Sequence, residues 1–171
     1  KLKVNYSGTF SISTKTDAID VMSANDFRTF VKSKYAEGSS QVAALGEYNT
    51  NWQDEIFRTA GMQNHAVSVS GGTAKVKYYG SLDYLKQDGV IINSDYSRYS
   101  ARLNLDVTEG IFKFGFSMNP SRTSENRVNA DGAYNSNGGG VIASALHSSP
   151  IFPVYNADGS FSFAQNSWSG D

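Results

Sequence analysis

Residues 63–118 alternate apolar and polar side chains over unusually long stretches, and no other feature restricts the possible folds as strongly. Between Ala74 and Lys86 the even positions are mostly apolar and the odd positions mostly polar. The same rhythm returns over residues 99–107 and 112–118. Successive side chains of a strand point to opposite faces, so each stretch has one apolar and one polar side. The pattern predicts consecutive strands of one two-faced sheet.

The length of these stretches points to a particular kind of sheet. Each holds its alternation for roughly 9 to 13 residues, whereas a typical strand has about 5 or 6. A strand that crosses a membrane needs about 9 to 11 residues, with an apolar side toward lipid and a polar side toward the lumen. We therefore predict part of a transmembrane β-barrel. A large soluble antiparallel sheet alternates in the same way and stays open as an alternative.

Composition removes several function classes. The chain has 15 Lys plus Arg and 16 Asp plus Glu, so no basic excess indicates a nucleic-acid partner. It has no cysteine, which excludes disulfides and thiolate metal sites. No apolar run reaches the roughly 18 residues of a membrane-spanning helix. The sequence starts in strand rhythm at Lys1, without Met, and stops abruptly at Asp171, so we expect a fragment of a larger protein.

The predicted elements form an up-and-down meander that is mainly β. Five strands are expected in sequential antiparallel order, at residues 2–13, 63–71, 74–87, 95–107 and 111–123. Short helices are expected at about 24–37, 51–60 and 141–147. Ser23 is the expected N-cap of the first helix and Gly38 suits its C-terminal end. Strand periodicity is absent from the rest of residues 120–167.

The connections fall into a short class and a long class. Gly71–Thr73 and Thr108–Gly110 are tight turns, whereas 14–62, 87–95 and 120–167 are long. The classes alternate along the chain, and alternate connections of a meander lie at the same end. Outer-membrane barrels have short periplasmic turns and long extracellular loops. This sorting favours the membrane barrel over a soluble sandwich and predicts that the helices lie in extracellular loops.

A series of motifs also resembles one family. The motifs are Trp52-Gln-Asp-Glu-Ile-Phe-Arg-Thr-Ala60, Met62-Gln-Asn-His65, Ser68-Val-Ser-Gly-Gly72, Lys77-Tyr-Tyr79, Ser81-Leu-Asp-Tyr84, Gly89-Val-Ile-Ile-Asn93 and Arg98-Tyr-Ser-Ala-Arg-Leu-Asn-Leu-Asp106. Their order resembles the early barrel of SusC/RagA-type TonB-linked outer-membrane proteins. Pro153-Val-Tyr-Asn-Ala-Asp-Gly159 is similar to a loop of that family. Gly61 departs from the family's pattern, in which Pro is expected at this position about as often as not.

The resemblance implies a transporter and no enzyme. Such a protein is a barrel of about 22 strands with a plugged lumen, in the outer membrane of a Gram-negative bacterium. It contacts outer-membrane lipid, a SusD-like surface lipoprotein covers it, and TonB drives import through the plug. Its substrates are oligosaccharides or peptides. Residues 1–171 would supply N-terminal strands and outer loops, with the plug and the other strands outside this chain. The alternative is a soluble β-rich glycan-binding module.

No catalytic, cofactor-binding or metal residue is assigned, and the substrate-binding residues are unknown at this stage. His65 and His147 lack partners at metal-ligand spacing. Residues 129–137 superficially resemble a calcium loop, but they lack a terminal Glu, so turn chemistry is preferred. Gly138–Gly140 precedes no Lys-Ser/Thr, which excludes a phosphate loop.

Acidic and aromatic residues are better explained by a barrel than by catalysis. Four aspartates could in principle form a glycosidase pair. We instead expect them on the polar face as lumen charges beside Arg98 and Arg102; they are Asp83, Asp88, Asp95 and Asp106. Aromatic girdles at the membrane interfaces would take Tyr78, Tyr84, Tyr96 and Tyr99.

The long connections carry their own apolar groups. Loop aromatics either pack within the loops, which we favour, or stack on sugars; they are Tyr134, Phe152, Tyr155, Phe161 and Trp168. The helix faces must be buried somewhere, and they comprise Phe27, Phe30 and Val31 on one helix and Trp52, Ile56 and Phe57 on the other. We expect these faces to pack into a collar that contacts the lipoprotein.

Overall fold

The computed structural model describes residues 1–130 and 140–162, which divide into two compact units. The first unit consists of Lys1–Thr16 and Phe57–Val128. The second consists of Asp17–Ile56 and the described residues from Asn129 onward. Each unit is presented by itself.

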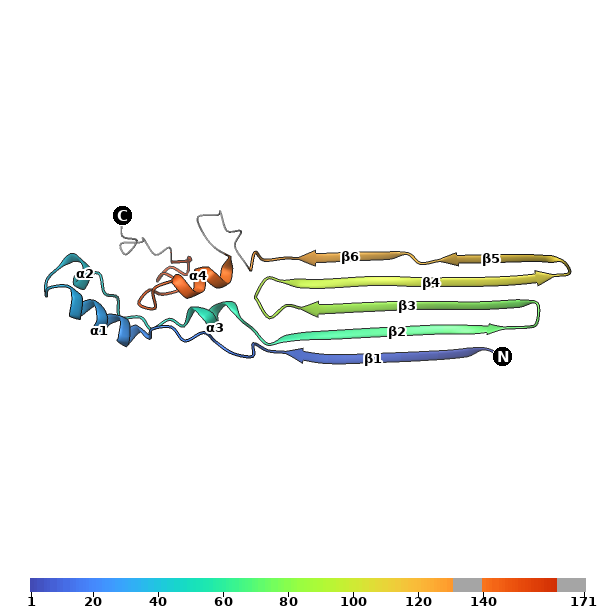
Figure 1. Cartoon of the computed structure of the whole chain (residues 1–171), viewed down its shortest axis with the longest axis horizontal. Coiled ribbons are helices and arrows are strands. Elements are labelled where there is room, and N and C mark those ends of the chain that lie inside the picture. Colours follow the sequence, from blue (N-terminus) through green and yellow to red (C-terminus); the bar gives the residue numbers. More distant parts are fainter. Residues whose placement is uncertain (131–139, 163–171) are drawn as a thin grey trace. The chain divides into compact units, whose positions relative to one another are not determined.

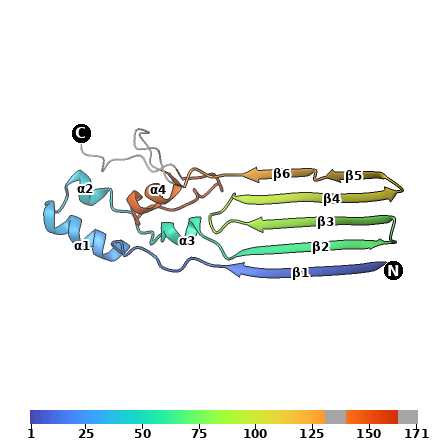
Figure 2. The same ribbon diagram turned by 45° about the vertical axis from the view of Figure 1, so that its right-hand side comes forward.

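The first unit is one antiparallel sheet. Its strands are β1 (Lys3–Ser13), β2 (Ala60–Gly72), β3 (Val76–Asp88), β4 (Asp95–Glu109), β5 (Phe112–Met118) and β6 (Ser121–Asn126). They lie in the order β1-β2-β3-β4-β5, and β6 also pairs with β4. Figures 1 and 2 show the strands side by side in chain order, with β5 and β6 end to end along β4. The predicted sequential antiparallel meander is confirmed.

β5 and β6 are two parts of one line of pairing that Pro120 interrupts. Leu103 pairs with Met118, and three residues back along β4, Ser100 pairs with Ser121, so the register is unbroken. Proline has no amide hydrogen and cannot donate to the ladder. Its carbonyl still accepts a hydrogen bond of 2.9 Å from the amide of Ala101. The expected strand 111–123 therefore contains a break and continues to Asn126.

The prediction that a long connection starts at residue 120 was wrong, because Ser121–Asn126 form β6. Its sequence, Ser-Arg-Thr-Ser-Glu-Asn, is polar on both faces, so no alternation marks it as a strand. Pairing with β4 decides its conformation.

The two classes of connection lie at opposite ends of the sheet, as predicted. Gly110 and Ile111 make a two-residue turn between β4 and β5. Gly110 has φ +59°, which suits the first central position of a type II′ turn. The turn between β2 and β3 comprises residues 73–75, with the amide of Thr73 donating to the carbonyl of Val76 at 2.6 Å. Both short turns lie slightly later than the predicted Gly71–Thr73 and Thr108–Gly110, because β2 continues to Gly72 and β4 to Glu109.

The long connections all leave from the other end. Ser13 pairs with Ala60 and Asp88 pairs with Asp95, so both connections start beside one another. Asn126, at the end of β6, pairs with Asp95 at that same end.

The second unit contains four short helices among the described residues. They are α1 (Ala24–Lys34), α2 (Ser40–Ala43), α3 (Trp52–Ile56) and α4 (Val141–His147). Helix α4 has the predicted bounds, whereas α2 was not predicted. Ser23 caps α1 as expected, because its hydroxyl oxygen accepts from the amide of Asp26 at 3.2 Å. Within residues 1–130 and 140–162, no helix is both long and apolar enough to span a membrane.

Two predicted helix ends were wrong. Helix α1 stops at Lys34 because Tyr35 is already extended, and Gly38, with φ +85°, lies in the following turn. Helix α3 stops at Ile56 because the chain turns into β structure, where Phe57 forms a bridge with Ile91.

Two segments distant in sequence pack together in the second unit. Ala24, Val31, Ala145 and Ile151 are buried at its core. The amide of Thr50 donates to the carbonyl of Pro150, and the indole Nε1 of Trp52 donates to the carbonyl of Ser149, both at 2.9 Å. Val31 is buried, as expected for the apolar face of the first helix, and Trp52 contacts a neighbouring loop at Ser149. Phe30 is an exception, because 46% of its surface stays exposed.

Candidate functional site

The pairing register assigns each strand residue to one of two faces of the sheet. Directly paired residues share a face. Leu103 pairs with Gly80 and Met118, whereas the next residue, Asn104, pairs with Tyr79 and Ser117. We call the side that carries Leu103 the apolar face and the side that carries Asn104 the polar face. The apolar face includes Val4, Tyr6, Phe10, Val67, Leu82, Tyr84, Tyr99, Leu103, Leu105, Phe114 and Phe116.

The apolar face is a broad exposed hydrophobic surface. For example, the exposed fraction is 72% for Phe10, 62% for Leu82 and 59% for Phe114. Monomeric soluble proteins rarely expose contiguous apolar patches larger than a few hundred Å². A surface of this kind needs lipid or another protein against it.

Side chains on the polar face are linked by hydrogen bonds. Arg102 donates from Nε to the Asn119 side-chain oxygen at 2.8 Å, and Ser117 donates to the Asn104 side chain at 2.9 Å. A guanidinium nitrogen of Arg98 lies 3.7 Å from a carboxylate oxygen of Asp83. The predicted Asp83–Arg98 partnership is therefore confirmed, whereas the partner of Arg102 is an amide and no aspartate.

Two of the four aspartates were assigned to the wrong face. Asp106 lies on the polar face with Asp83, but Asp88 and Asp95 pair with each other on the side of Tyr84 and Tyr99. They lie where β3 and β4 meet the long hairpin, beyond the apolar stretch. Asp95 accepts a hydrogen bond of 2.7 Å from the Asn126 amide group. Alternation alone predicts this facing, since 88 continues the even positions of β3.

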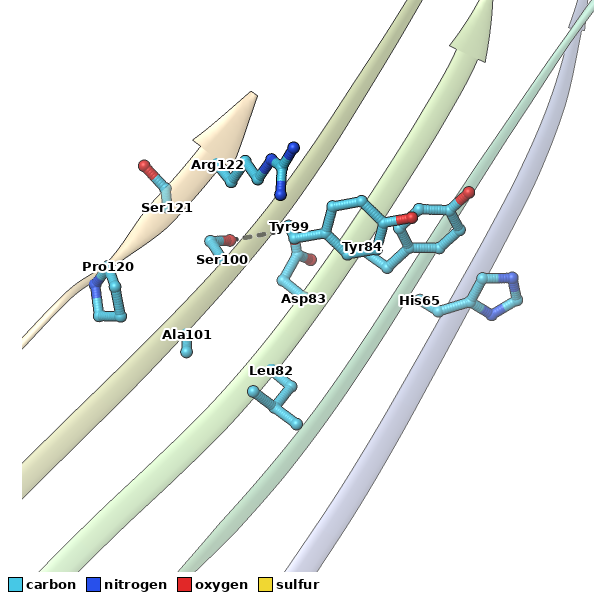
Figure 3. Close-up of a pocket in the computed structure, with 10 residues that line it drawn as sticks. All are labelled: His65, Leu82, Asp83, Tyr84, Tyr99, Ser100, Ala101, Pro120, Ser121 and Arg122. Carbon is cyan, nitrogen blue, oxygen red and sulfur yellow. Dashed lines mark hydrogen bonds between the residues drawn. The ribbon is translucent and has the colours of Figure 1, made fainter. Parts of the chain in front are cut away.

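Aromatic residues cluster at the end of the apolar face near the long connections. Tyr84 and Tyr99 are paired across β3 and β4, with ring centroids 4.7 Å apart and planes inclined by 29°. His65 pairs with Tyr84 from β2, and Figure 3 shows the three rings in a row. Tyr78 is on the same face, six positions from Tyr84 toward the short turns. Tyr96 was wrongly grouped with them, because it pairs with Gln87 on the polar face.

The apolar stretch is nearly as tall as the apolar band of outer-membrane barrels. From Val107 to Tyr99 the strand advances about 27 Å at ~3.4 Å per residue. For strands tilted by about 40°, this corresponds to about 21 Å along the membrane normal, near the ~25 Å apolar band of outer-membrane barrels.

A shallow hollow lies beside the aromatic row on the apolar face. Its volume is about 520 Å³. Leu82, Ala101 and Pro120 line it from one row, and Tyr84, Tyr99 and Arg122 from the next (Figure 3). The small side chain of Ala101 leaves the space between larger neighbours. Sequence reasoning missed Arg122, because β6 shows no alternation that would place it on a face.

His65 has structural partners on β1. The Tyr6 hydroxyl lies 2.8 Å from Nδ1 of His65, and the Phe10 ring meets the imidazole edge-on at a centroid distance of 5.3 Å. His147 lies in the last turn of α4, as expected. Among residues 1–130 and 140–162, no three His, Cys, Asp or Glu side chains form a metal-binding group.

Asn156-Ala-Asp-Gly159, at the end of the loop motif that starts at Pro153, forms a tight turn. Gly159 has φ +82°, and the amide of Asn156 donates to the carbonyl of Ser160 at 2.8 Å. The hydroxyl of Ser160 donates to Asp158 at 2.6 Å and its amide at 3.0 Å, which holds the pKa of the Asp158 carboxyl below its usual range. The rings of Tyr155 and Phe161 stack above this turn at 5.1 Å.

Some predicted features lie outside the described residues. They are most of the calcium-like segment 129–137, which includes Tyr134, and in addition Gly138, Gly139 and Trp168.

Comparisons with known proteins identify similar proteins of one kind. No family model matches the chain. It is 36% identical over 162 residues to TonB-dependent receptor P3 of Formosa agariphila, covering 94% of this chain. It is 32% identical over 166 residues to TonB-dependent receptor SusC of Bacteroides thetaiotaomicron, covering 96% of this chain. The chain spans 16% of the length of each of these relatives.

Solved structures share the fold. The RagAB peptide transporter matches 95% of this chain with a TM-score of 0.71 at 18% identity. The RagAB peptide importer in its open-open state matches with a TM-score of 0.69 at 17% identity. In each case the match covers 22% of the solved chain.

Proposed function

The chain belongs to the SusC-type TonB-dependent receptors, and from this premise we propose that it forms wall strands and outer loops of a nutrient importer. Residues 1–171 would supply strands from the N-terminal part of the barrel, while the plug and the other strands lie outside them. The protein would reside in the outer membrane of a Gram-negative bacterium. It would import oligosaccharides or peptides, and it would catalyse no reaction.

The two-faced sheet is the observation that carries this proposal. Most apolar side chains of β1 to β5 share one exposed face, and hydrogen-bonded polar groups such as Arg102 and Asn104 lie on the other. In a barrel, the first face contacts lipid and the second lines the lumen. A soluble glycan-binding module would have to cover the apolar face with a second layer.

The second unit has the role of an external collar in this proposal. The connections that contribute to it start at the end of the sheet that carries the long hairpin. Long connections of this kind are usually functional. We assign them to contact with a SusD-like surface lipoprotein and with captured substrate. TonB would act through the plug, so none of its contacts are assigned to this chain.

Two matched cysteine substitutions test the orientation. Ile92 lies in the hairpin between β3 and β4, and Ile111 lies in the turn at the opposite end of the sheet. The chain itself contains no cysteine. In the complete receptor made cysteine-free, a membrane-impermeant maleimide should label Ile92→Cys on intact cells. It should label Ile111→Cys only after the outer membrane is permeabilised.

The control is labelling of both variants in permeabilised cells, which must be equal. Equal labelling on intact cells would contradict the proposed orientation. Labelling of Ile111→Cys alone would invert it.

A further inference from the structure

Two basic side chains lie at the edge of the apolar face that borders the long connections. Arg122 on β6 pairs with Tyr99, and Lys86 on β3 is the next same-face residue after Tyr84. In a barrel wall, both would project toward lipid at the level where the hydrocarbon layer ends. Cations facing lipid at this depth are costly unless an anion or the interface accommodates them.

Within the described part of the chain, neither side chain has a partner. No hydrogen bond or ion pair of the described residues involves the Arg122 guanidinium or the Lys86 ammonium. Both residues are exposed. The nearest acids on this face, Asp88 and Asp95, lie farther toward the long hairpin, and Asp95 already accepts a hydrogen bond from Asn126. Asp83 also lines the hollow, but it belongs to the polar face, where a guanidinium nitrogen of Arg98 lies 3.7 Å from its carboxylate. On the apolar face, the positive charge therefore lies beside the apolar stretch and the negative charge lies beyond it.

An apolar hollow adjoins Arg122 directly. Leu82, Ala101 and Pro120 line the hollow one row deeper into the apolar stretch, and Arg122 stands at its rim with Tyr99 (Figure 3). With a volume of about 520 Å³, the space can hold several methylene groups of a flexible chain. A cation at the rim and an apolar hollow behind it match a molecule with an anionic head and a hydrocarbon tail.

From this arrangement we propose that Arg122, Lys86 and the hollow form a binding site for a lipid whose phosphate headgroup carries a net negative charge, in the leaflet next to the long connections. The site rests on the proposed function, which turns the apolar face toward lipid. The phosphate lies against the two cations, and an acyl chain enters the hollow past Ala101. Tyr84 and Tyr99 fix the depth of the headgroup, because tyrosine combines an apolar ring with a polar hydroxyl.

A lipid fits better than a soluble anion. The hollow is lined mainly by apolar groups, and it opens on the face that carries Leu103 and Phe114. A free phosphate would use the cations alone and leave the hollow empty. Basic residues near a membrane surface contribute to binding of anionic lipids by amounts that correspond to about fivefold in affinity for each residue.

The test uses the complete receptor, made cysteine-free and reconstituted in lipid nanodiscs. Ser97 lies on the same face and pairs with both Lys86 and Ser124, so Ser97→Cys places a bimane fluorophore within the proposed site. Quenching by brominated phosphatidylglycerol is compared with quenching by brominated phosphatidylcholine. We expect phosphatidylglycerol to be preferred at Ser97. At Phe116→Cys, near the other end of the same face, we expect no preference.

Variants that change the charge or the shape of the site then show which residues cause the preference for phosphatidylglycerol. Arg122→Gln and Lys86→Gln should each reduce it about fivefold, and Ala101→Phe should reduce it while keeping both cations. The matched control is Arg102→Gln on the polar face, which should leave the preference unchanged. Circular dichroism and resistance to unfolding in detergent establish that each variant is assembled.

The outcomes separate this site from the proposed function. If bimane at Leu103→Cys is quenched by neither lipid, the apolar face does not contact lipid and the proposed function fails. If Leu103→Cys is quenched but Ser97→Cys shows no preference, or if the preference survives loss of both cations, only the lipid site is refuted. Displacement by added glycerol phosphate would instead identify a site for a soluble anion and would also overturn the proposal.

Discussion

Tyr84 and Tyr99 stack across β3 and β4 with ring centroids 4.7 Å apart, at the boundary between the apolar stretch and the long hairpin. The pair marks one edge of the apolar face, and Tyr78 marks the other, near the short turns. Amphipathic aromatic rings at both edges are typical of strands that cross a bilayer.

The stacking of this pair predicts coupled stabilities. Tyr84→Ala and Tyr99→Ala should each destabilise the receptor, and the double variant should lose less than the sum, because the ring contact can be lost only once. A double-mutant cycle of unfolding in bilayers should give a coupling energy of about 0.5–1.5 kcal/mol. Tyr78 and Tyr99 serve as the control, because they are not paired across the sheet. The losses of stability from Tyr78→Ala and Tyr99→Ala should therefore add up. A coupling of zero for the stacked pair would show that the contact contributes nothing.

Lysine scanning distinguishes the two faces. Leu103→Lys places a charge toward lipid, which costs about 2–4 kcal/mol near the bilayer midplane, whereas Asn104→Lys faces the lumen and should be tolerated. Folding yield into lipid vesicles is the measurement. Equal yields for the two variants would refute the facing assigned from the register.

The side chain of Gln53 stabilises the second unit through the backbone of Ile19. It is only 5% exposed, donates to the carbonyl of Ile19 at 2.7 Å and accepts from its amide at 3.0 Å. Gln53→Leu removes both bonds and leaves two backbone groups unpaired, at about 1–3 kcal/mol for each buried group. We expect faster proteolysis within residues 17–23. The half-buried Gln41 offers a control, since Gln41→Leu should not change the cleavage rate.

The core of the second unit should matter for partner binding more than for barrel assembly. Ile151 is fully buried, so Ile151→Asp places a charge in the core, which is strongly unfavourable. If the second unit is the proposed collar, the variant receptor should reach the outer membrane but co-purify less of the proposed SusD-like lipoprotein. Ile19→Asp is the matched control, because the Ile19 side chain is 58% exposed. Normal co-purification with Ile151→Asp would show that the collar is not the contact surface.

The turn at Asp158 should be sensitive to acid. Hydrogen bonds from the Ser160 hydroxyl and amide lower the pKa of Asp158 in the folded turn. Its stabilising contribution is therefore complete above the unfolded pKa of about 3.9 and is lost as the pH falls through the lower folded value. Fluorine NMR of fluorotyrosine at position 155 should show a transition below that pH. Asp158→Asn should abolish it, and a transition that persists in this variant would assign it to another group.

The sequence by itself determined the sheet's alternating faces and the sorting of its turns. Strict alternation leaves no other face for Leu103 or Asn104, because successive strand residues point to opposite sides. The same alternation puts Asp88 on the apolar face and Tyr96 on the polar face, as the structure does. Their charge and aromatic character had favoured the opposite faces. The cap at Ser23 and the bounds of α4 also follow from local sequence, since both depend on contacts within a few residues.

Register and long-range packing were decided only by the tertiary structure. Sliding a strand by two residues keeps every face unchanged, so alternation could not place His65, Tyr84 and Tyr99 in one row. β6 has no alternation at all, and only its pairing with β4 puts Arg122 beside the hollow. The bonds of Gln53 to Ile19 and of Trp52 to Ser149 join residues far apart in sequence. Such contacts depend on how complete segments pack, and no local pattern encodes that packing.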